Sequence, residues 1–112
     1  MAASPASAVK TLVDKLIKDN IVMVFSKSYC PYCSKAKNVF ASFGAALKSY
    51  KVVELDERDD GNAIQDYLGQ LTGGRSVPRV FVGGKFIGGG DDTVALHNKG
   101  ELKKMLEEAG AL

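Results

Sequence analysis

The stretch that decides the fold is IVMVFSKSYCPYC, at residues 21–33. Its first six residues form a continuous β-prone run, which is typical of a strand covered on both faces. Residues 27–31 then turn the chain. Pro31 suits the first turn of a helix, because its fixed φ and its missing N–H are both tolerated there. We therefore predict a central strand that feeds into a helix, with Cys30 and Cys33 at the transition.

Helices on either side of this unit are predicted from apolar residues that recur every three to four positions. Their predicted positions are residues 5–18, a segment from Pro31 whose apolar side reaches Phe43 and Leu47, residues around 64–71, and two short C-terminal segments. The residues that mark their starts or ends are Ser4 and Pro5, the glycines at 73–74, the pair Asp91 and Asp92, and a capping box of Asn98 with Glu101.

The remaining strands are predicted at residues 50–55, 79–82 and 85–87. The last two are joined by Gly83 and Gly84, and a two-residue Gly-Gly loop favours an antiparallel hairpin. A crossover helix between the first two strands makes that pair parallel and right-handed. The order αβαβαββαα therefore predicts an α/β fold in which a four-stranded mixed sheet is flanked by helices.

Length and composition predict a single domain over residues 1–112. The hydrophobic fraction of 46% and the charged fraction of 25% match an ordinary globular protein. A net charge of +2 is too small to indicate a nucleic-acid or membrane surface, so neither partner is expected. The first ten residues lack the apolar run of a secretory signal, which favours a reducing, cytoplasmic location.

The two cysteines are the residues that point to chemistry. They lie three positions apart, so they cannot tie distant segments together, but they can form a reversible disulfide. Cys30, at the positive end of the predicted helix with Lys27 nearby, is expected to be the thiolate nucleophile, and the deeper Cys33 the resolving cysteine. The alternatives are incidental core cysteines or part of a zinc site. Zinc needs four ligands and His97 is the one other soft ligand, so no metal is expected.

Three sequence motifs together resemble those of the dithiol glutaredoxins, and their residues are most similar to those of plant and algal members. They are Cys-Pro-Tyr-Cys at 30–33, Ser-Val-Pro at 76–78 and Gly-Gly-Gly-Asp-Asp at 88–92, and the likeness runs from about Val9 to Leu106. The resemblance implies a thioredoxin-like fold in which Pro78 is cis and lies beside the cysteines. From the residues alone, an ordinary proline at a strand edge would be preferred.

The resemblance also implies a groove for glutathione. The residues that it assigns to this groove are Lys27 and Gln65 for the glycine carboxylate, Val77 beside Pro78 for backbone pairing, Tyr32 for the thioether, and Asp91 and Asp92 for the γ-glutamyl end. Two simpler interpretations stay open: Gln65 could stand unused on a solvated helix face, and Asp91 could serve as a helix cap only. Arg79 is expected to steer anionic substrates without contacting glutathione.

The implied activity is that of a monomeric oxidoreductase. Glutathione would be both reductant and co-substrate for the reduction of protein–glutathione mixed disulfides and protein disulfides, with regeneration by glutathione reductase and NADPH. One rival is a thioredoxin-like enzyme fed by a flavoprotein reductase, against which Tyr32 and the 88–92 segment argue. Another is a dimer that holds an iron-sulfur cluster between two Cys30 thiolates and two glutathiones, which the stiff Pro31 disfavours.

Overall fold

The computed structural model describes residues 5–112, and its centre is the strand that the sequence places there. All five residues of β1 (Val22–Ser26) are buried. It pairs in parallel with β2 (Tyr50–Glu54) and antiparallel with β3 (Arg79–Val82), which pairs antiparallel with β4 (Lys85–Gly88). The strand order is β2-β1-β3-β4, so the predicted mixed sheet is confirmed.

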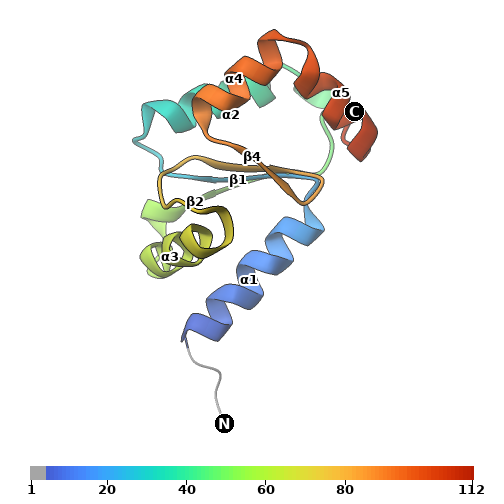
Figure 1. The fold of residues 1–112 in the computed structure, drawn as a ribbon. Coiled ribbons are helices and arrows are strands. Elements are labelled where there is room, and N and C mark those ends of the chain that lie inside the picture. The colour runs from blue at the N-terminus through green and yellow to red at the C-terminus, as the bar shows by residue number, and fades with distance from the viewer. Residues whose placement is uncertain (1–4) are drawn as a thin grey trace.

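Within residues 5–112, five helices cover the two faces of the sheet (Figure 1). One face carries α1 (Pro5–Asp19) and α3 (Gly61–Thr72), and the other carries α2 (Pro31–Ala41), α4 (Gly90–Asn98) and α5 (Glu101–Ala109). Two short 3₁₀ turns, η1 (Gly44–Ala46) and η2 (Leu55–Glu57), flank β2. The chain thus builds three layers, with the sheet in the middle.

Alternation along β1 explains why both faces need a cover. Val22 and Val24 pack into the core under α2 and α5, while Met23 and Phe25 pack into the core shared with α1 and α3. Successive side chains of a strand point to opposite faces, so a strand that is apolar throughout supplies both cores.

The β3–β4 hairpin turns through Gly83 and Gly84, whose φ angles of +59° and +82° are those that a two-residue loop requires. Gly73, with φ +84°, ends α3 as predicted. No helix within residues 5–112 is long and apolar enough to cross a membrane. The start signal predicted at Ser4 lies outside the described residues.

Two predicted helix boundaries are wrong. The second helix ends at Ala41, where the Ser42 hydroxyl donates to the Val39 carbonyl, and Phe43 and Leu47 reach the core from the irregular segment beyond it. The last helix has no capping box of Asn98 and Glu101. Asn98 belongs to α4, and Gly100, with φ +75°, is the residue before α5. A left-handed glycine reverses the chain between α4 and α5 and leaves Asn98 too early to cap the second one.

Candidate active site

Cys30 occupies the N-cap position of α2 and is half-buried. Its N–H donates to the Lys27 carbonyl at 3.1 Å, which closes the turn between β1 and the helix. Its sulfur accepts a hydrogen bond from the Cys33 N–H at 3.2 Å. A helix N-terminus leaves backbone N–H groups without partners inside the helix, and the Cys30 sulfur lies beside one of them.

Cys33 lies one turn deeper and is fully buried. Burial raises the pKa of its thiol to about 11, and the neighbouring Cys30 side chain adds to the effect. The Lys27 N–H donates to its sulfur at 3.4 Å. Both cysteines are free thiols. The pair is therefore asymmetric, with an accessible sulfur at the surface and a protonated one beneath it.

The second motif lies directly beside the first. The peptide bond between Val77 and Pro78 is cis, as the resemblance implied. The Cys30 thiol faces the Val77 carbonyl oxygen at 3.7 Å, across 47 positions of sequence. The backbone of Val77 therefore borders the reactive sulfur, where an extended peptide could pair with it.

Gln65 reaches this loop from α3, but it does not stand on a solvated face, so that interpretation is wrong. The residue is only 8% exposed, and its Nε2 donates to the Arg75 carbonyl at 2.7 Å. The amide thus fastens α3 to the segment that leads into Val77. The pattern of α3 did not reveal this role, because the acceptor is a backbone atom outside the helix.

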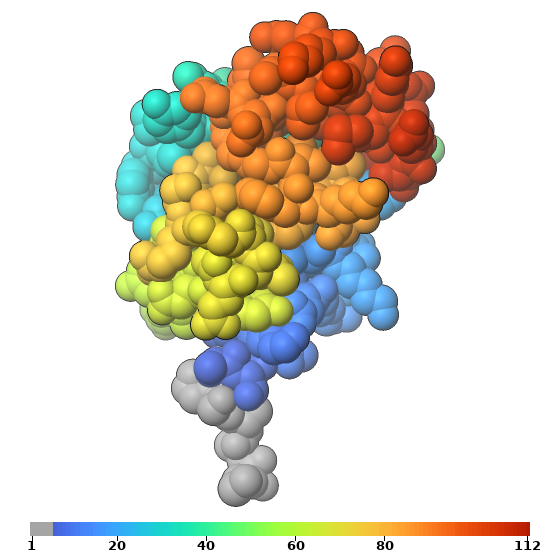
Figure 2. All heavy atoms as spheres, viewed as in Figure 1, coloured from blue at the N-terminus to red at the C-terminus, as the bar shows by residue number. Residues whose placement is uncertain are grey.

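The third motif brings the start of α4 against the other two. A Cβ on Gly90 would lie 2.5 Å from the Tyr32 carbonyl oxygen, and one on Gly89 would lie 3.5 Å from the Pro78 carbonyl oxygen. Glycine therefore allows α4 to approach α2 at backbone distance. Figure 2 shows α2 in cyan, the segment before β3 in yellow and α4 in orange meeting along one edge of the molecule.

The two aspartates of this motif differ in their contacts. Asp92 accepts a hydrogen bond from the Gly89 N–H at 3.0 Å, so it caps the helix. The Asp91 carboxylate is exposed and lies 3.6 Å from the Lys35 ammonium. The predicted cap is therefore Asp92, and the Asp91 side chain stays open to solvent and ligands.

Aromatic rings flank the nucleophile. Tyr32 is 52% exposed, and the Lys35 ammonium lies 4.9 Å from the centre of its ring. Tyr29, immediately before Cys30, is 71% exposed. Sequence reasoning missed Tyr29, although an aromatic residue in a turn next to a reactive cysteine is a usable signal. Both rings are large apolar surfaces that a bound partner could cover.

Arg79 lies at the start of β3, just after Pro78. Its guanidinium group is 5.1 Å from the centre of the Phe86 ring and donates to the Ser76 hydroxyl at 3.2 Å. Its buried Nε has no hydrogen-bond partner among the described residues. These contacts hold the side chain along the hairpin, and its role in steering anions stays a prediction.

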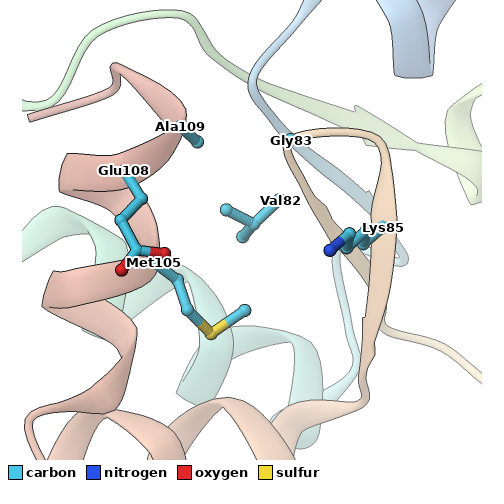
Figure 3. A pocket seen from close by; sticks show the side chains of 6 residues that line it. All are labelled: Val82, Gly83, Lys85, Met105, Glu108 and Ala109. Carbon is cyan, nitrogen blue, oxygen red and sulfur yellow. The ribbon is translucent and has the colours of Figure 1, made fainter.

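A hollow of about 360 Å³ lies at the other end of β3, between the hairpin turn and α5 (Figure 3). Its lining residues are Val82, Gly83, Lys85, Met105, Glu108 and Ala109. It contains neither cysteine and none of the predicted ligands, so it is separate from the thiol site. No group of three or more His, Cys, Asp and Glu side chains within the described part of the chain forms a metal site.

The comparisons with known proteins agree with this geometry. The glutaredoxin family profile matches residues 22–87. A glutaredoxin of Ricinus communis is 51% identical over 91% of this chain and 97% of the relative. Oxidised glutaredoxin 2 of Chlamydomonas reinhardtii shares 54% identity with a TM-score of 0.88, covering 98% of this chain and all of that one. A buckwheat glutaredoxin–glutathione complex shares 42% identity with a TM-score of 0.89, covering 100% and 99% of the two chains.

A thioredoxin-like sheet that presents an accessible thiol above a buried one defines the class of thiol–disulfide oxidoreductases. Within that class, the chain belongs to the glutaredoxin family. The predicted fold and the predicted glutathione-dependent oxidoreductase activity are both confirmed.

Proposed function

We propose that the protein reduces mixed disulfides between proteins and glutathione, with Cys30 as the attacking sulfur. The observation that carries this proposal is the asymmetry of the two thiols. Cys30 is accessible and accepts an N–H hydrogen bond, whereas Cys33 is buried with its pKa raised to about 11. Because only a thiolate attacks a disulfide, the first attack at neutral pH belongs to Cys30.

In the first step, the Cys30 thiolate attacks the glutathione sulfur of the mixed disulfide. The bond between glutathione and the target breaks, the target leaves as a thiolate that takes up a proton, and Cys30 becomes glutathionylated. A second glutathione thiolate then attacks the bound glutathione sulfur. This step releases oxidised glutathione, regenerates the Cys30 thiolate and supplies the two electrons of the reduction.

Reduction of a disulfide within a protein would use Cys33 as well. After Cys30 has formed a mixed disulfide with the target, Cys33 would attack Cys30, form the Cys30–Cys33 disulfide and release the target. Since burial keeps Cys33 protonated, this route needs a proton to leave a buried thiol first. We therefore expect it to be slower at neutral pH than the route through Cys30 alone.

The proposed glutathione-binding site is the edge of the molecule where the three motifs meet. The Val77 backbone beside Pro78 would pair with the cysteinyl unit, and the N–H groups at the start of α4 would hold the γ-glutamyl carboxylate. The open Asp91 and the capping Asp92 would attract its ammonium group. A buckwheat relative was solved in complex with glutathione, which supports glutathione as the ligand.

The other side of this binding site would bind the glycine carboxylate of glutathione. Lys27 would supply a charge, and the Gln65 amide, already bonded to Arg75, would act by holding the loop in place. The exposed ring of Tyr32 would pack on the thioether.

We further propose that the protein works as a monomer in the cytoplasm and is kept reduced by glutathione, glutathione reductase and NADPH. A reducing compartment suits a chain whose cysteines are both free thiols. Light scattering of the purified protein and imaging of a fluorescent fusion in cells would test the first two points.

The decisive assay follows NADPH oxidation in the presence of glutathione reductase, glutathione and a glutathionylated peptide. We expect activity in the wild type and in Cys33→Ser, and none in Cys30→Ser. Equal loss in both variants would contradict the route through Cys30 alone. An inactive wild type that accepts electrons from thioredoxin reductase would contradict the glutathione-dependent function.

Lys27→Gln tests the proposed glutathione-binding site in the same assay. We expect a KM for glutathione raised about tenfold, because one charge-assisted contact contributes roughly 1.5 kcal/mol. Lys51→Gln, an equal change of charge at an exposed position of β2, is the matched control and should leave KM unchanged.

A further inference from the structure

The turn that carries Cys30 is anchored by a residue from another part of the chain. Asp56, in η2 directly after β2, lies 28 positions from Ser28. One of its carboxylate oxygens accepts the Ser28 N–H at 2.9 Å, and the other accepts the Ser28 hydroxyl. Asp56 thus binds both donors of the residue in the middle of the turn.

This turn determines where both sulfurs lie. The Cys30 N–H closes it on the Lys27 carbonyl at 3.1 Å, and the Lys27 N–H donates to the Cys33 sulfur at 3.4 Å. A displaced turn would move the Cys30 sulfur away from the Cys33 N–H and from the Val77 carbonyl. By binding Ser28, Asp56 therefore helps to fix the position of the reactive Cys30 sulfur.

The Asp56 carboxylate is charged at neutral pH. The Ser28 hydroxyl and then the Ser28 N–H hold the pKa of the Asp56 carboxyl below its usual range, and the nearby Lys27 ammonium adds to this effect. Hydrogen bonds to an ionised acceptor are stronger than those between neutral groups. Both carboxylate oxygens are therefore available to Ser28 under the conditions in which the enzyme works.

We propose that Asp56 is a positioning residue for the nucleophile. By binding Ser28, it holds the Lys27–Cys30 turn in place, so that the Cys30 sulfur keeps its hydrogen bond from the Cys33 N–H at the start of α2. Asp56 acts through Ser28, to which both of its carboxylate oxygens are hydrogen-bonded. The inference deepens the proposed function, since it rests on Cys30 as the attacking group.

The test measures how fast iodoacetamide alkylates Cys30 in the 112-residue chain near neutral pH, with the labelled residue located by mass spectrometry. Alkylation proceeds through the thiolate, and the Cys33 N–H donates to the Cys30 sulfur, so we expect a sulfur displaced from this donor to react more slowly. We expect Asp56→Ala to slow alkylation, and kcat/KM for a glutathionylated peptide, about tenfold, the effect of one lost charge-assisted hydrogen bond.

Two further variants separate positioning from charge and from stability. Asp56→Asn keeps an oxygen for the Ser28 N–H and offers its amide to the Ser28 hydroxyl, so we expect it to retain most of the wild-type rate. Asp59→Ala removes an equal charge from an exposed neighbour in the same segment and should react like the wild type.

A wild-type alkylation rate in Asp56→Ala would overturn the proposal, and so would equal slowing in Asp59→Ala. Should Asp56→Ala fail to fold, Ser28→Ala decides in its place: slowing of several-fold supports the anchor and an unchanged rate refutes it. If alkylation responds as expected but the wild type does not reduce the peptide, the proposed function fails and the positioning role stands.

Discussion

Cys30 and Cys33 have the same side chain and lie one helical turn apart, yet their surroundings give them different chemistry. Cys30, as the N-cap residue, is accessible to a substrate and accepts an N–H hydrogen bond at its sulfur. Cys33 is enclosed by the core, and burial raises the pKa of its thiol to about 11. The division of labour between attack and resolution thus follows from a difference in depth.

One prediction at the residue scale concerns selective labelling. At about pH 7, a limiting amount of iodoacetamide should modify Cys30 and leave Cys33 free, because the buried thiol is both protonated and shielded. Peptide mapping by mass spectrometry measures the distribution. In Cys30→Ser, the labelling of the native protein should fall to the background level, while the unfolded variant labels normally. Comparable labelling of both cysteines in the native wild type would contradict the asymmetry.

At the scale of elements, the site depends on α4 beginning close against the backbone of α2. A Cβ on Gly90 would lie 2.5 Å from the Tyr32 carbonyl oxygen, a backbone atom that cannot yield unless α2 shifts. On Gly89 a Cβ would meet the Pro78 carbonyl oxygen at 3.5 Å, an ordinary contact. One glycine therefore sets the distance between the helices, and its neighbour does not.

Gly90→Ala should lower the free energy of unfolding by about 1–3 kcal/mol, the usual cost of overpacking. Gly89→Ala, the matched control, should cost less than about 1 kcal/mol. Urea denaturation followed by circular dichroism measures both. Equal losses in the two variants would mean that the backbone contact between α2 and α4 does not limit the packing.

At the scale of the whole molecule, Cys33 links stability to pH. Its pKa rises from an ordinary 9.0 to about 11 on folding. Below pH 9 the thiol is protonated in both states, so its contribution to stability is fully present. Between pH 9 and about pH 11, the Cys33 thiol loses its proton in the unfolded chain but keeps it in the folded one. The free energy of unfolding therefore falls as pH rises through this window.

The expected loss attributable to Cys33 across this window is about 2–3 kcal/mol, since each pKa unit corresponds to about 1.4 kcal/mol. Urea unfolding of the reduced protein at several alkaline pH values measures it. Cys33→Ala is the reference, because it keeps every other titrating group. The stability advantage of the wild type over this variant should shrink as pH rises, and a constant difference would refute the linkage.

Local signals predicted most of the elements. The unbroken apolar run of β1, the Pro31 start of α2, the Gly73 end of α3 and the Gly83–Gly84 turn each act within a few residues, so they could be recognised in the sequence. The wrong boundaries, at Ala41 and Gly100, lie where the chain turns to meet the core. There the backbone follows packing and not the apolar period.

The sequence by itself determined the order of strands and helices, the placement of Cys30 at a helix start and, through three motifs, the family. Only the tertiary structure decided that Gln65 is buried on Arg75, that Asp92 and not Asp91 caps α4, and that Asp56 anchors Ser28. The physical reason is the range of the interactions. Turns, caps and periodicity depend on neighbours along the chain, whereas burial and hydrogen bonds between distant segments exist only once the sheet has brought those segments together.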